Sequence, residues 1–151
     1  MDEISVQAAD FDPGGEIAAL SWGDAGAVAS FVGLVRQDGA VTAMTLEHYP
    51  GMTEAALADI VVAARARWPL LAVRIVHRIG RLLPGERIVF VGVAAAHRHA
   101  AFAACEFIMD YLKTQAPFWK KEETLAGARW VEARESDERA AQRWQDGVTD
   151  G

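Results

Sequence analysis

The sequence predicts an α+β fold, a two-layer sandwich in which helices pack on one face of a largely antiparallel sheet. Segments with the patterns of strands and of helices alternate along the chain. Several connections between the strand-like segments are too short for the crossover that parallel neighbours need. The nearly all-apolar segment at residues 88–96, IVFVGVAAA, is typical of a central strand that is covered on both faces.

Six segments have the composition or the alternation of strands. Residues 41–49 alternate polar and apolar side chains, and residues 26–36 are rich in Val and Phe. The turn sequences QDG and LPGE each separate two neighbouring segments. The predicted strands are residues 3–11, 26–36, 41–49, 71–80, 87–96 and 128–134.

Four segments are predicted to be helices, at residues 12–22, 50–68, 98–113 and 136–144. Asp12 is placed to cap the first helix, with Pro13 at its first position, and Pro69 ends the second. Apolar residues at helical spacing predict the buried side of each long helix. These residues are Leu57, Ile60, Val61, Ala64 and Trp68 in one and Phe102, Cys105, Ile108, Met109 and Leu112 in the other.

Length and composition limit the class of protein. A chain of 151 residues with 52% apolar residues is expected to form a single domain, residues 1–151, with a flexible tail at about residues 146–151. The formal net charge of -6 argues against general nucleic-acid binding. No apolar run reaches the length of a membrane span, and the acidic N-terminus lacks the features of a signal peptide. We therefore expect a soluble, cytoplasmic protein.

Cationic residues at the ends of the predicted elements are the main candidates for a site. His97 and Arg98 stand where a buried strand leads into the longest helix, and a helix N-terminus favours an anion. Lys113 ends that helix and Lys120 follows the turn APFW, so a chain reversal can bring both ammonium groups to one pocket. A desolvated lysine can then act as a nucleophile or as an acid at neutral pH.

Each of these residues also has a plainer explanation. His97 can serve as a helix cap, a lysine at a helix C-terminus complements the dipole, and KKEE can be a solvated charge run. Arg36 and Arg134 end two predicted strands, where arginines are often only rim residues. Taken together, however, these cations at element ends suggest one ligand with more than one anionic group.

Other kinds of site lack support in the sequence. The single cysteine, Cys105, lies on the apolar side of its helix, which favours a buried structural thiol and excludes an internal disulfide. The histidines lack the spacing of a zinc site, so no metal or cofactor is expected. The absence of a phosphate-loop pattern argues against a nucleotide-binding domain or phosphate-ester hydrolase.

Six segments occur in an order that resembles a known family. They are FVGLVR, TLEHYPGM, HRIGRLLPGE, VGVAAAHRHAAF, IMDYLKTQAPFWKKE and RWVEARESD. Together they are similar to the large subunit of molybdopterin synthase, the MoaE family, over about residues 26–144. The resemblance implies an α/β hammerhead fold, which is compatible with the two-layer prediction.

The resemblance also implies a reaction and partners. Members of the family convert cyclic pyranopterin monophosphate into molybdopterin by installing the two sulfurs of its dithiolene. The sulfur arrives as a thiocarboxylate on the C-terminal Gly-Gly of a small ubiquitin-like carrier subunit. Two large subunits form a homodimer with one carrier at each end, which gives a heterotetramer.

The resemblance assigns residues to these tasks. Lys113 and Lys120 match the essential lysines, the first nearest the terminal glycine of the carrier. The expected substrate-binding residues are Leu34, Val35, Arg36, His97, Arg98, Lys121, Glu122 and Arg134, the last contributed across the dimer.

Two departures concern the outer edge of the expected pocket. The turn QDGAV after Arg36 is shorter than the common family form, and Leu34 stands where a lysine is frequent. An alternative function is a non-catalytic scaffold that binds a ubiquitin-like tail. A scaffold would not need Lys113 and Lys120 together with the His97–Arg98 pair, so the sequence favours the enzyme.

Overall fold

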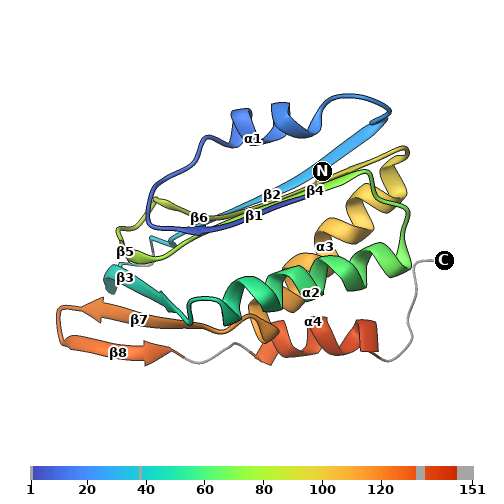
Figure 1. Ribbon diagram of the computed structural model, residues 1–151. Helices are drawn as coiled ribbons and strands as arrows, with labels where there is room; N and C mark the ends of the chain where they lie inside the picture. The colour runs from blue at the N-terminus through green and yellow to red at the C-terminus, as the bar shows by residue number, and fades with distance from the viewer. Residues whose placement is uncertain (1, 38, 132–134, 146–151) are drawn as a thin grey trace.

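The computed structural model describes residues 2–37, 39–131 and 135–145, which form two sheets and the helices that cover them (Figure 1). The predicted tail at residues 146–151 lies outside the described residues. The elements in chain order are β1 (Glu3–Gln7), α1 (Pro13–Leu20), β2 (Ala27–Leu34), β3 (Val41–His48), α2 (Met52–Arg67), β4 (Ala72–Arg78), β5 (Gly80–Leu82), β6 (Arg87–Ala95), α3 (Arg98–Gln115), β7 (Phe118–Thr124), β8 (Gly127–Val131) and α4 (Glu135–Gln145).

The first sheet has the strand order β1-β4-β6-β2. Strand β6 pairs antiparallel with both β2 and β4, while β1 joins the edge of β4 in parallel. The predicted α+β class with a largely antiparallel sheet is therefore confirmed, and the all-apolar segment is the inner strand that was expected.

After Arg87, strand β6 is apolar to its end because it has a core on each face. Val89, Val91 and Val93 belong to the larger core under α2 and α3, whereas Phe90 and Ala94 belong to a smaller core with Leu20 of α1. Figure 1 accordingly shows α1 on one side of the sheet and α2, α3 and α4 on the other. The expectation that all helices share one face holds for α2 and α3 and is wrong for α1.

The second sheet has the order β5-β3-β7-β8, and its neighbouring strands are antiparallel. The strand predicted at residues 71–80 corresponds to β4 of the first sheet, and it is followed by a short strand, β5 of the second sheet, that was not predicted. The chain changes sheets at Gly80, whose φ of 91° is a conformation that favours glycine. Strand β7 was not predicted, because its charged sequence KKEE was interpreted as a solvated run.

The helices largely follow the predicted pattern. The Asp12 carboxylate accepts a hydrogen bond from the backbone N–H of Gly14 and so caps α1, as expected. In α3, Cys105, Ile108, Met109 and Leu112 are buried, but Phe102 is 68% exposed and does not belong to the core. No helix within the described ranges is both long and apolar enough to cross a membrane.

Helix α4 packs on α3 through a buried tryptophan. The Trp144 ring makes edge contacts with Trp68, which directly follows α2, and with Phe107 of α3. Its Nε1–H donates to the Asp110 carboxylate at 2.7 Å, and its carbonyl accepts from Arg67 at 2.8 Å. These contacts hold the C-terminal helix against the half of α3 that carries Lys113.

Gly92 allows α1 to approach the sheet, and we predict that Gly92→Ala is destabilising. A Cβ at this position would lie 2.5 Å from Leu20 Cδ1 and 2.7 Å from the Phe90 ring. Overpacking of this kind should lower the free energy of unfolding by about 1–3 kcal/mol, measured by urea denaturation.

The control is Gly14→Ala in α1, whose added Cβ would meet only Asp12 Oδ1 at an ordinary 3.5 Å. It should change the free energy of unfolding by less than about 1 kcal/mol. Equal effects of the two substitutions would contradict this account of the α1 interface.

Candidate active site

A cavity of about 420 Å³ lies where β2, β3, β4, β6 and β7 meet the C-terminal end of α3. Its walls are partly apolar, with Met44, Leu46, Leu112 and Phe118 among the lining residues. The titratable and charged residues that line it are Arg36, His77, Lys113, Lys120, Glu122 and Asp137. Of the predicted site residues, Leu34, Val35, Arg36, Lys113, Lys120 and Glu122 lie in this lining.

The fold brings Lys113 and Lys120 to this cavity from two different elements. Lys113 lies in the last turn of α3 and Lys120 lies in β7, after the chain turns at Ala116 and Pro117. Alternate residues of a strand share a face, so Lys120 and Glu122 both reach the cavity. Both lysines are half-buried, which is the setting in which a charge acts strongly on a bound group.

The strand end that carries Arg36 is fixed by backbone hydrogen bonds to the turn before β6. Val35 N–H donates to the Glu86 carbonyl at 2.9 Å, and Gly85 N–H donates to the Val35 carbonyl at 2.8 Å. Val35 is buried, while its neighbours Leu34 and Arg36 are exposed at the edge of the cavity.

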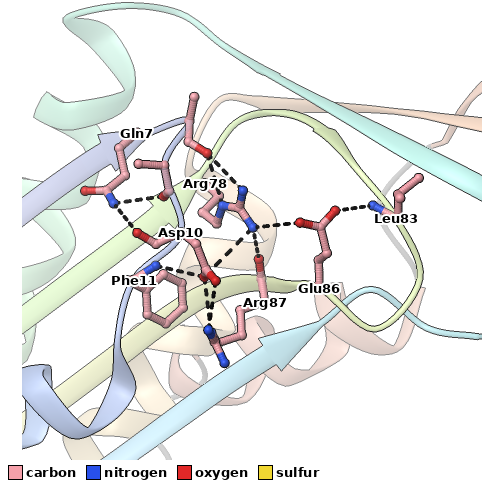
Figure 2. Close-up of polar contacts among 9 residues, drawn as sticks. Gln7, Asp10, Phe11, Arg78, Leu83, Glu86 and Arg87 are labelled. Atoms are coloured by element: carbon pink, nitrogen blue, oxygen red, sulfur yellow. Dashed lines mark hydrogen bonds and ion pairs between the residues drawn. The ribbon is translucent and has the colours of Figure 1, made fainter.

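The same turn is held by the buried guanidinium of Arg78 (Figure 2). Arg78 donates to the Ala8 carbonyl at 3.1 and 3.0 Å, to the Arg87 carbonyl at 3.2 Å and to Glu86 at 3.5 Å. Glu86 in turn accepts from Leu83 N–H at 2.6 Å. Arg78 thus connects the end of β1, the turn before β6 and, through that turn, the segment with Val35.

The structure does not bring His97 and Arg98 to this cavity within one chain. Both are exposed at the N-terminal end of α3, and His97 makes no side-chain capping hydrogen bond. Arg98 is the first residue of α3 and Lys113 lies in its last turn, which corresponds to about 22 Å along the axis. The inference that all these cations surround one ligand is therefore wrong for a single chain.

Two other predicted residues also stand apart. Lys121 is absent from the cavity lining, and its ammonium lies 5.7 Å from the centre of the Trp130 ring, as in a cation–π contact. Its position next to Lys120 on a strand directs it to the opposite face. Arg134 lies outside the described residues.

His77 is a lining residue that the sequence interpretation missed. It is 5% exposed, and its ring stacks on Phe118 with the ring centres 3.8 Å apart. Burial is the main reason that the pKa of His77 falls from 6.5 to about 4, and the charges of Lys113, Lys120 and His48 contribute to this shift. The sequence pattern could have revealed His77. It continues the alternation of the buried residues Val73 and Ile75 along one strand, so a polar side chain was to be expected at an inward position.

Cys105 is the structural thiol that was expected. It is buried and donates to the Val91 carbonyl at 3.6 Å, and burial raises its pKa to about 12. Within the part of the chain that the structure describes, no group of three or more His, Cys, Asp or Glu residues is placed to hold a metal ion.

Comparison with known proteins identifies the family of this chain. The family model described as "MoaE protein" matches residues 6–115, which is most of the chain and includes Arg36, His77 and Lys113. The chain belongs to the MoaE family. The resemblance inferred from the sequence motifs is thus confirmed.

Close relatives extend over nearly the whole MoaE chain. A protein of Pseudomonas aeruginosa named molybdopterin synthase catalytic subunit is 63% identical, covering 95% of this chain and 99% of its own. A protein of the same name from Ralstonia nicotianae is 62% identical, and the match covers 95% of this chain and 85% of the relative. The solved structure of the MoaE protein of Burkholderia ambifaria is 56% identical in sequence, with a TM-score of 0.84. The match covers 99% of this chain and 100% of that chain.

We predict that His77 makes the stability of this MoaE chain depend on pH. The folded protein keeps the imidazole neutral down to about pH 4, whereas the unfolded chain takes up a proton near pH 6.5. The free energy of unfolding should therefore fall by roughly 3 kcal/mol between pH 6.5 and pH 4 on account of this residue.

The measurement is urea denaturation at several pH values for the wild type and for His77→Phe, which retains an aromatic ring beside Phe118. The variant should lack this part of the pH dependence. Parallel curves for the two proteins would show that His77 does not remain neutral in the folded state.

Proposed function

We propose that this chain is the catalytic subunit of a molybdopterin synthase and acts as a sulfurtransferase in the cytoplasm. The observation that carries the proposal is the meeting of Lys113 and Lys120, from separate elements, in one cavity that Arg36 also lines. The names of the Pseudomonas and Ralstonia relatives support it, because the similarity extends over nearly all of the chain.

The cavity suits the proposed substrates. A thiocarboxylate and cyclic pyranopterin monophosphate are both anionic, and the three cations Arg36, Lys113 and Lys120 offset their charge. The acidic residues Glu122 and Asp137 also line the cavity, so the cations are not all available to one ligand. The Glu122 carboxylate forms an ion pair with the Arg129 guanidinium at 3.6 Å. Its negative charge is therefore partly balanced by Arg129 rather than by the lysines.

The proposed reaction is the one that the family resemblance implies. The thiocarboxylate sulfur of the carrier attacks a side-chain carbon of the pterin. A carbon–sulfur bond forms while a carbon–oxygen bond at the same carbon breaks, the departing oxygen takes up a proton, and the carrier is then attached as a thioester. One of the two lysines stabilises the developing negative charge, and the other transfers a proton. Water then cleaves the thioester, which leaves sulfur on the pterin and a carboxylate on the carrier. A second loaded carrier repeats the sequence.

The partners are a small ubiquitin-like carrier and a second copy of this chain. The C-terminal Gly-Gly of the carrier has no side chains and can therefore enter a cavity of this size. His97 and Arg98 lie about 22 Å from Lys113 along α3, so they contact the substrate only if a second copy presents its α3 N-terminus to this cavity. The proposed heterotetramer of two chains and two carriers provides such a copy.

We predict that Lys113→Ala and Lys120→Ala each lower product formation at least 100-fold, because each removes a cation that contacts the reacting groups. The assay mixes the protein with a thiocarboxylated carrier and cyclic pyranopterin monophosphate, and measures the fluorescent oxidised form of the product.

Lys121→Ala is the matched control, since it removes the same charge from the neighbouring position on the opposite face of β7. It should keep activity within about twofold of the wild type. Carrier binding by the wild type without any product would instead support the alternative, a scaffold that binds a ubiquitin-like tail.

We also predict that two inactive variants complement each other in a mixed dimer. Arg98→Ala and Lys113→Ala chains are co-expressed with different tags, and activity is measured on the mixture. Random pairing yields mixed dimers with one complete cavity each, so about a quarter of the wild-type activity should return. If Arg98 served the cavity of its own chain, no activity would return.

A further inference from the structure

His77 is a buried polar residue to which the proposed reaction gives no task. It lies in β4 with its side chain on the same face as Val73 and Ile75, yet it reaches the cavity that Lys113 and Lys120 also line. A polar group in this position needs hydrogen-bond partners, because an unsatisfied one is costly to bury.

The hydrogen bonding of the ring determines which nitrogen carries the proton. Nδ1 lies 2.8 Å from the Arg78 carbonyl oxygen. A carbonyl only accepts hydrogen bonds, so Nδ1 must carry the hydrogen and donate it. In the neutral imidazole Nε2 then has a lone pair and can only accept.

The ring is held firmly in this orientation. Phe118 of β7 stacks on it with an interplanar angle of 17°. The Arg78 carbonyl that accepts from Nδ1 belongs to a residue whose side chain is itself held by Ala8, Glu86 and Arg87 (Figure 2). A buried and supported side chain of this kind is suited to orienting another group.

The charged and titratable groups that act on His77 come from three neighbouring elements. They are Lys113 of α3, Lys120 of β7 and His48 of β3. Together with burial, their charges keep the pKa of His77 low, so the ring is uncharged at neutral pH. The residue therefore offers an acceptor beside two cationic donors without adding charge of either sign.

We propose that His77 is a positioning residue for the cavity lysines, with Nε2 accepting a hydrogen bond from a lysine ammonium group. A carboxylate at this place would orient the ammonium as well, but it would also neutralise the positive charge that the anionic substrates require. A neutral imidazole orients the lysine and preserves that charge. The catalytic consequence of this arrangement rests on the proposed function, whereas the contact between His77 and the lysine does not.

Three substitutions of His77 distinguish the role of Nδ1 as a donor from the role of Nε2 as an acceptor. His77→Gln places a carbonyl oxygen near the position of Nε2 and so keeps an acceptor. His77→Asn keeps a donor near Nδ1 but loses the acceptor, and His77→Phe loses both while retaining the stack on Phe118. Circular dichroism and thermal unfolding establish which variants are folded, and the Gln and Asn pair is sufficient if the Phe variant is not.

The first measurement uses the protein alone. NMR titration of ¹³Cε-labelled lysine, assigned with Lys113→Arg and Lys120→Arg, gives the pKa of each cavity lysine. Loss of the acceptor should lower the pKa of at least one of them by about 0.5–1 unit in His77→Asn and His77→Phe, and His77→Gln should restore it. Identical lysine titrations in all of the proteins would overturn the proposal.

The second measurement is the synthase assay with the carrier and the pterin substrate. His77→Asn should lower kcat about tenfold with little change in KM for the carrier, and His77→Gln should retain most of the activity. Equal activity of the Asn and Gln variants would overturn the positioning role. If the wild type made no product, the proposed function would fail, and the lysine titration would still decide the role of His77.

Discussion

The buried guanidinium of Arg78 is the interaction on which the arrangement of the cavity depends. An arginine in this setting is stable only with its donors satisfied, because an unpaired buried charge costs about 3–5 kcal/mol. Its partners are the Ala8 and Arg87 carbonyls and Glu86, which belong to segments far apart in the sequence. The turn that contains Glu86 then fixes Val35, while the Arg78 carbonyl orients His77. One residue at the end of β4 thus supports both the edge and the interior of the cavity.

The charge of the whole chain gives a poor guide to the charge of its cavity. The net charge is -6, yet the cavity lining includes Arg36, Lys113 and Lys120. Many of the acids form ion pairs on other parts of the surface, such as Asp2 with Arg65 at 2.5 Å. Surface pairs of this kind contribute little to stability. Because these acids lie away from the cavity, an entering anion meets the local charges of the lining rather than the net charge of the chain.

Much of the fold could be predicted because local patterns agreed with the tertiary structure. The Asp12 cap, the apolar strand β6 and the buried Cys105 follow from short-range rules. Strand β7 could not be predicted in this way. Its charged residues resemble an exposed run, and it becomes a strand because β3 and β8 pair with it on both sides. Phe102 shows the opposite error. Its helical spacing suggested burial, but among the described residues no element covers that part of α3.

The sequence by itself determined the strands and helices of most of the chain, the family, and the lysines and arginine that the motifs singled out. Such features depend on residue type and spacing, which are visible in one dimension. Only the tertiary structure decided which cations share a cavity. It joined Lys113 and Lys120 across the turn before β7, separated them from Arg98 by the length of α3, and placed His77 between the sheets. These outcomes depend on how the two sheets and α3 pack, and packing is set by contacts between residues distant in the chain.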